Sequence, residues 1–157
     1  MLPSIDTLIA MLHTQGIMLP PGRVGIDEYG DSPELSRKLL ALIREGRKRA
    51  GASLLWAHEA DGEPIPAVGD ILIVLDDRLE PALVVRSTHV SILPFNEVSA
   101  DYAALEGEGD LSLDYWRRAH WNFFGRECTR IGRERSETMP VVCGVFEVLH
   151  LLGDRAR

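Results

Sequence analysis

The chain has 157 residues, 45% of them hydrophobic and 26% charged, which is the composition of an ordinary folded domain. Disordered, collagen-like and coiled-coil classes are excluded, and the apolar runs fall far short of the ~20 residues that span a bilayer. The formal net charge of -7 argues against a protein that coats nucleic acid without selectivity, because such binding needs an excess of Lys and Arg. No secretion signal is recognisable at the start, so we expect a cytoplasmic protein with no membrane partner.

The basic residues are concentrated in two stretches. Residues 37–49 hold six Lys or Arg against one acid, and residues 116–135 hold six against two. These two stretches carry a formal charge of +9, whereas the rest of the chain carries -16. Any cationic binding surface is therefore expected to involve these residues.

Capping residues and helical periodicity predict three helices. Each begins at a serine cap and ends at a glycine, and Gly125 is the one weak position of the longest. The three are expected at residues 4–16, 32–46 and 112–132.

Segments rich in Val and Ile predict strands, and a turn at residues 76–81 makes the central two antiparallel. A second hairpin-like element is expected after Pro94. The candidate strands lie at residues 71–75, 82–92 and 141–152, and two shorter apolar segments lie at residues 24–26 and 52–56. Helices fall early and late while strands cluster, which indicates an α+β fold, a small mixed, mostly antiparallel β-barrel with flanking helices.

The chain is expected to divide into an N-terminal helix and connector at residues 1–22, a compact domain at 23–152 and a tail at 153–157. Pro20 and Pro21 mark the connector. The first helix carries an apolar face of its own, which favours an assembly role such as a homodimer. Cys128 and Cys143 form no metal or redox motif and are expected to be reduced core thiols.

Three consecutive cations, Arg47, Lys48 and Arg49, follow the end of a predicted helix. Helix carbonyls favour cations there, so a solvated basic face explains them as well as a site does. Crowding by two guanidinium groups disfavours the ammonium form, so a Lys48 shielded from water could act as a base or nucleophile near neutral pH. An isolated lysine in a cleft contributes little packing, so Lys48→Ala is expected to leave the melting temperature nearly unchanged.

Two polar junctions are further candidates. Glu106, Glu108 and Asp110 alternate with glycines, and such a loop binds a divalent cation such as Mg²⁺, pairs with Lys48 or is simply solvated. No other cofactor or metal is indicated. Asp31 precedes a helix cap, where backbone amides receive an anion or where the chain merely turns.

Trp116 and His120 belong to an aromatic face of the last predicted helix, together with Phe123 and Phe124. Such a face is either core or a platform on which a base stacks, and interleaved arginines are typical of the second. His120 is either a hydrogen-bonded packing residue or a ligand.

Several motifs resemble, in order and spacing, the ASCH domain family in its larger bacterial branch. The resemblance covers the chain from about Val24 to about Leu149, and it rests on YGDSPELSRKLLALIREGRKRAGASLLW, VGDILIVLDD, LPFNEVS, EGEGDLSLDYWRRAHWNFF and MPVVCGVFEV. It implies a PUA-like β-barrel with helices around a cleft, in a family associated with RNA and, in a smaller branch, with hydrolysis of N4-acetylcytidine and similar acylated nucleosides.

The resemblance also implies roles for individual residues. The functional lysine of the family matches Lys48, and its acidic partner matches Glu106, with Glu108 as the alternative. In the amidohydrolase branch the lysine begins a K-x-x-T pattern, and Gly51 stands here in place of that threonine. Ser53 lies two residues further on and would share the face of Gly51 on a strand.

The leading hypothesis is a domain that binds RNA or a modified nucleoside in a cleft. Hydrolysis would be either amide cleavage of an acylated cytidine or cleavage of single-stranded RNA. The alternative is a non-catalytic interaction or effector-binding module. A buried Lys48 that faces Glu106 inside a concave pocket would favour chemistry, whereas a solvent-facing Lys48 on a flat basic strip would favour binding alone. Candidate catalytic residues are Lys48, Glu106 and Ser53, and candidate substrate-binding residues are Arg47, Arg49, Asp31, Glu108, Trp116 and His120.

Overall fold

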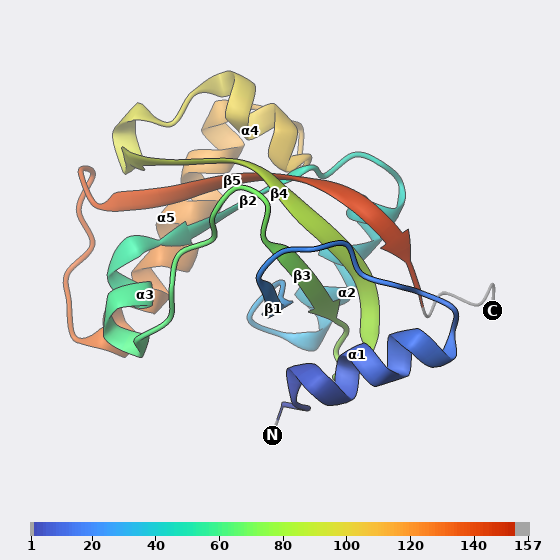
Figure 1. Ribbon diagram of the computed structural model, residues 1–157. Helices are drawn as coiled ribbons and strands as arrows, with labels where there is room; N and C mark the ends of the chain where they lie inside the picture. The colour runs from blue at the N-terminus through green and yellow to red at the C-terminus, as the bar shows by residue number, and fades with distance from the viewer. Residues whose placement is uncertain (1, 153–157) are drawn as a thin grey trace.

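A curled sheet of five strands forms a half-barrel in the computed structural model, which describes residues 2–152 (Figure 1). The strand order is β1-β3-β4-β5-β2, so β1 and β2 form its edges. The strands are β1 (Val24–Glu28), β2 (Ala50–Leu54), β3 (Ile71–Leu75), β4 (Pro81–Pro94) and β5 (Pro140–Leu151). The predicted α+β class is confirmed.

The pairing of the strands explains the curl. Only β1 and β3 run parallel; the other three pairs are antiparallel, and β4 lies along β5 from Leu83 to Pro94. The register of β4 on β5 shifts between Val84 and Val85 and again between Ser87 and His89. Such irregularities bend and twist a strand pair, so the two long strands wrap around the core.

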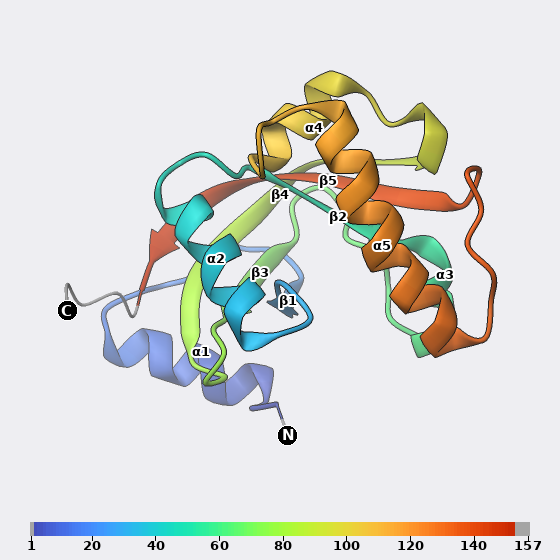
Figure 2. The same cartoon turned by 180° about the vertical axis from the view of Figure 1, so that it is seen from behind.

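The three predicted helices are confirmed with their caps. Ser4, Ser32 and Ser112 each accept a hydrogen bond from the backbone three residues on. They begin α1 (Ile5–Thr14), α2 (Pro33–Arg44) and α5 (Leu113–Ile131). Figure 2 shows α2 and α5 in front of the sheet and α1 behind it.

Two short helices were not predicted. β2 passes directly into the first of them, α3 (Leu55–Asp61). The prediction of a hairpin-like element after Pro94 is wrong. A 3-10 turn, η1 (Phe95–Glu97), and α4 (Ala100–Glu106) stand there instead. Ser99 caps α4 and Gly107 ends it with a φ of 72°, so the capping signals were present in a segment too short to show periodicity.

The first helix packs on the sheet. Leu8 and Leu12 of α1 are fully buried against Ile71 and Ile73 of β3, so the apolar face of the helix is covered within the chain. The other face of β3 carries Val74, which packs with α2. The boundary at residue 23 and the homodimer stay predictions, and the tail at 153–157 lies outside the described residues.

Both cysteines are free and buried, as predicted. Burial raises the pKa of Cys143 to about 12, which keeps its thiol protonated. Between residues 2 and 152, no helix combines the length and apolar character that crossing a membrane requires.

Candidate active site

Lys48 and Glu106 meet inside the protein although 58 positions separate them. Lys48 Nζ donates to Glu106 Oε1 at 2.5 Å and to Glu108 Oε2 at 2.9 Å. Lys48 lies between the end of α2 and β2, and Glu106 is the last residue of α4. The backbone holds the two segments together, since Arg49 N donates to the carbonyl of Leu105 at 2.8 Å. The predicted approach of residues 47–49 to the acidic loop is confirmed.

Gly107 allows this close approach. Its φ of 72° is left-handed, and a Cβ there would overlap the carbonyl of Arg47. A side chain at this position would push the acidic loop away from Lys48.

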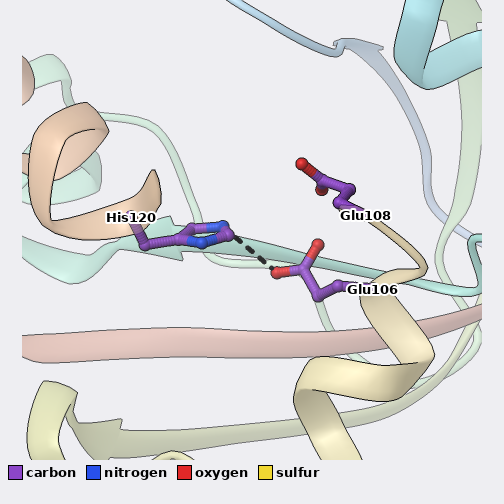
Figure 3. Close-up of side chains that lie close together, drawn as sticks. All are labelled: Glu106, Glu108 and His120. Atoms are coloured by element: carbon purple, nitrogen blue, oxygen red, sulfur yellow. Dashed lines mark ion pairs between the residues drawn. The ribbon is translucent and has the colours of Figure 1, made fainter. Parts of the chain in front are cut away.

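Glu106 is held from its other side by α5. Trp116 Nε1 donates to Glu106 Oε2 at 3.0 Å, and His120 Nε2 lies 3.3 Å from the same oxygen (Figure 3). The rings of Trp116 and His120 stack with centroids 4.2 Å apart, one helical turn from each other. Both oxygens of this carboxylate are therefore engaged.

Burial makes these contacts energetically important. The side chains of Lys48 and Glu106 are 2% and 1% exposed, whereas that of Glu108 is 18% exposed. Within the Lys48–Glu106–Glu108 group, Glu108 is thus the member that solvent or a substrate reaches.

The carboxylates decide the charge of Lys48. Burial disfavours its ammonium form, but the charges of Glu106 and Glu108 outweigh burial and raise its pKa above the ordinary value. The expectation that Lys48 has a destabilised ammonium form is therefore wrong, because its neighbours in space are acids and not Arg47 and Arg49. Lys48 remains a cation and a hydrogen-bond donor near neutral pH.

Glu106 remains ionised as well. Burial opposes its ionisation, yet the charge of Lys48 and the hydrogen bond from His120 hold its pKa well below the usual range. Glu106 thus orients its neighbours and is a poor general acid. The Nδ1 of His120 donates to the carbonyl of Trp116 at 2.9 Å, so Nε2 is the ring nitrogen that faces Glu106.

Tyr29 is a functional candidate that sequence reasoning missed. Lys48 Nζ lies 5.9 Å from the centre of its ring, and burial together with the charges of Asp27 and Glu106 raises its pKa well above the ordinary value. Its phenol is therefore a proton-bearing donor next to the ammonium. The sequence feature that could have identified Tyr29 is its position at the end of β1, directly before the turn into α2.

Tyr29 also fills the space beside Gly51. A Cβ at Gly51 would lie 3.3 Å from Tyr29 Cε1 and 3.9 Å from its hydroxyl oxygen. A phenol therefore lies close to where the threonine of a K-x-x-T pattern would start. Gly51 has no positive φ, so its backbone accepts a side chain.

Ser53 pairs with His58 and not with the Lys48 group. Its Oγ lies 2.8 Å from His58 Nε2, across the junction of β2 and α3. The Nδ1 of His58 is buried and has no hydrogen-bond partner among residues 2–152. A histidine base is normally oriented by a partner on its second nitrogen, so this pair lacks that support.

The remaining candidates lie outside this group. Arg47 is exposed and comes within 3.9 Å of Glu45, while Arg49 donates to the carbonyls of Ile43 and Lys48. Asp31 is exposed and pairs with Arg126 of α5 at 2.8 Å.

Trp116 is 2% exposed, enclosed by Phe95 and Tyr102 as well as His120. Stacking of a base on Trp116 stays a prediction that this burial does not favour.

A cation could be held by Glu106, Glu108 and His120, whose ligand atoms lie within 4.8 Å of one another (Figure 3). Lys48 Nζ already lies between the two carboxylates, where it supplies the positive charge. Asp110 accepts from Ser112 N at 2.9 Å and is not part of this group. A metal there would compete with the ammonium.

The chain matches the family model of the ASCH domain over residues 26–150. It belongs to the ASCH domain family. The resemblance seen in the motifs, and the PUA-like fold that it implies, are thereby confirmed.

Two solved structures are similar to this ASCH domain. The ASCH domain from Lactobacillus crispatus JV V101 is 38% identical, with a TM-score of 0.75 over 80% of this chain and 79% of that one. The protein EF3133 from Enterococcus faecalis V583 is 32% identical, with a TM-score of 0.77 over 94% of this chain and 88% of that one. No curated protein matches the chain in sequence.

Proposed function

We propose that this ASCH domain binds a modified nucleoside or an RNA nucleotide at the Lys48 site and hydrolyses the amide of an acylated cytosine. The supporting observation is that the ammonium of Lys48 is buried between two carboxylates. Lys48, Glu106 and Glu108 together have a formal charge of -1, and a proton on His120 Nε2 brings the group only to zero. Such a site suits a neutral amide better than a phosphodiester, whose cleavage needs surplus positive charge.

The reaction divides between the accessible and the buried residues. The carbonyl oxygen of the acyl group replaces Glu108 on Lys48 Nζ, and the ammonium then stabilises the oxyanion that forms. The released Glu108 carboxylate takes a proton from the water that attacks the carbonyl carbon. It passes that proton to the leaving nitrogen as the carbon–nitrogen bond breaks, giving cytidine and the free acid.

Tyr29 and Glu106 support this step in different ways. The phenol of Tyr29 donates a second hydrogen bond to the substrate, in place of the hydroxyl that Gly51 lacks. Glu106 does not change protonation; it keeps Lys48 charged and fixed in position. A K-x-x-T threonine is therefore not required for this chemistry.

The test is turnover of N4-acetylcytidine, followed by chromatography of cytidine and acetate. Glu108→Gln should lower kcat by roughly 100-fold or more, the usual contribution of a general acid–base group. Asp110→Asn is the matched control, since it removes a neighbouring carboxylate whose hydrogen bond goes to Ser112 and not to Lys48. Full activity of Glu108→Gln, or a wild type inactive on every acylated cytidine, contradicts the proposal.

The second candidate is recognition of RNA or a nucleoside without catalysis. It is favoured by the hydrogen bonds of Lys48 Nζ, which go to Glu106 and Glu108 and leave the ammonium without a free position. Binding of a nucleoside by a wild type that releases no product would support it. Cleavage of a labelled single-stranded RNA would instead support ribonuclease activity.

A further inference from the structure

A hollow of about 700 Å³ lies on the second half of α5, away from the Lys48 group. It is bordered by the chain that follows the helix, which Figure 2 shows running from the end of α5 toward β5. Three arginines line it, Arg126, Arg133 and Arg135, against a single acid, Glu134. In a chain of net charge -7, this is a local concentration of positive charge.

Two of these arginines are held by aromatic rings and not by carboxylates. The guanidinium carbon of Arg133 lies 4.1 Å from the ring centre of Trp56, and that of Arg135 lies 4.7 Å from Trp121. Neither forms an ion pair with any residue between 2 and 152. Arg130 differs, since Asp61 and Glu127 neutralise it. Arg133 and Arg135 are thus oriented by stacking while their charges stay available.

Gly125 makes room for Arg135. A Cβ at this position would lie 2.5 Å from Arg135 Nη1, and the same nitrogen donates to the carbonyl of Trp121 at 3.2 Å. A glycine inside a helix costs about 1 kcal/mol relative to alanine. The weak position noted in the sequence is therefore the position at which the Arg135 guanidinium approaches the backbone of α5.

The chemistry of the hollow fits phosphate groups joined to bases. A guanidinium presents a planar set of donors that matches phosphate oxygens. Arginines interleaved with aromatic rings are typical of proteins that bind single-stranded nucleic acid.

The hollow is also near enough to the Lys48 group to share a ligand with it. Thr129, which lines the hollow, is nine residues from His120, or about 14 Å along the helix. Arg126 pairs with Asp31, two residues from Tyr29, so the hollow borders the loop that carries Tyr29.

We propose that the groove formed by residues 122–135 binds the phosphates of single-stranded RNA. This rests on the proposed function and deepens it: the cytosine at the Lys48 site then belongs to an RNA strand rather than to a free nucleoside.

The experiment measures binding of a fluorescein-labelled 12-nucleotide single-stranded RNA by anisotropy at several salt concentrations. The double variant Arg133→Ala/Arg135→Ala should raise Kd at least tenfold in 0.1 M salt. It should also reduce the salt slope by about 1.4, since each phosphate contact on a single strand contributes about 0.7. Arg78→Ala is the control, because Arg78 is exposed at the turn between β3 and β4 and makes no ion pair within residues 2–152.

Gly125→Ala provides an independent test that removes no charge. The added methyl displaces the Arg135 guanidinium, so RNA affinity should fall at least threefold. Helix propensity should meanwhile keep the melting temperature equal or higher. Lost affinity therefore cannot be explained by unfolding.

Three results overturn the groove: no RNA binding by the wild type, an equal loss in Arg78→Ala, or a labelled polyglutamate peptide that binds the same arginines as tightly as RNA. Turnover of free N4-acetylcytidine separates this proposal from the first one. If the double variant keeps both RNA binding and nucleoside turnover, the proposed RNA-binding groove is refuted and the proposed hydrolysis stands. If the groove binds RNA while no acylated cytidine is hydrolysed, the proposed hydrolysis is refuted and the RNA-binding groove stands.

Discussion

Removing the charge of Lys48 should destabilise the whole domain. The substitution Lys48→Ala leaves Glu106, 1% exposed, without its cationic partner. Breaking a buried ion pair by removing one partner costs about 3–5 kcal/mol. For a domain of this size each kcal/mol lowers the melting temperature by about 2–4 °C, so the expected decrease is about 6–20 °C. This replaces the expectation from sequence that the melting temperature hardly changes.

The pH dependence of this loss has a definite sign. In the wild type the pKa of Glu106 is lowered on folding, so its stabilising contribution is present above about pH 4.5 and is lost below it. Without Lys48, burial raises the pKa of Glu106, and the buried carboxyl takes up a proton as the pH falls. The difference in stability between wild type and Lys48→Ala should therefore narrow from pH 7.5 to pH 5.

The assay is thermal unfolding followed by circular dichroism at both pH values. Lys48→Met/Glu106→Gln should recover a large part of the loss, because neither buried charge then remains. Lys38→Ala, on the exposed side of α2, is the control and should change the melting temperature by about 1 °C or less. A melting temperature of Lys48→Ala within 2 °C of the wild type at pH 7.5 would refute the reasoning.

Three further substitutions have expected outcomes. Burial raises the pKa of Asp27 to about 6, so its ionised form destabilises the fold above that pH. In urea unfolding, Asp27→Asn should therefore raise the free energy of unfolding by about 1–3 kcal/mol at pH 8 and leave it unchanged at pH 4. Trp116→Phe removes a donor to Glu106 and should cost about 1.5–3 kcal/mol in the same assay, with no loss if the indole hydrogen bond is unimportant. Gly107→Ala should lower the free energy of unfolding by more than 2 kcal/mol, because the new methyl overlaps the carbonyl of Arg47. It should also weaken nucleoside binding measured by calorimetry, and a stable variant that still binds would contradict the role of this glycine.

The acidic loop shows how far local patterns predict a site. The sequence identifies Lys48 and Glu106 through the family motifs, and the structure brings them together. The sign of the pKa shift of Lys48 was wrong, since neighbours along the chain are not its neighbours in space. Arg47 and Arg49 turn to other partners, whereas Glu106 comes from 58 positions away.

Local sequence determined the elements of this fold. Serine caps at positions 4, 32 and 112 and β-branched runs at 71–75 and 82–92 fix helices and strands, because capping and side-chain periodicity act within a few residues.

Only the tertiary structure decided which groups act together. Tyr29 beside Gly51, Trp116 on Glu106 and Arg135 on Gly125 are contacts that no side-chain periodicity along the chain predicts. Their effects depend on distances of a few ångströms and on exclusion of water, which strengthens each charge interaction. Those quantities arise when the sheet curls and α4 and α5 close over it, and no short stretch of sequence contains them.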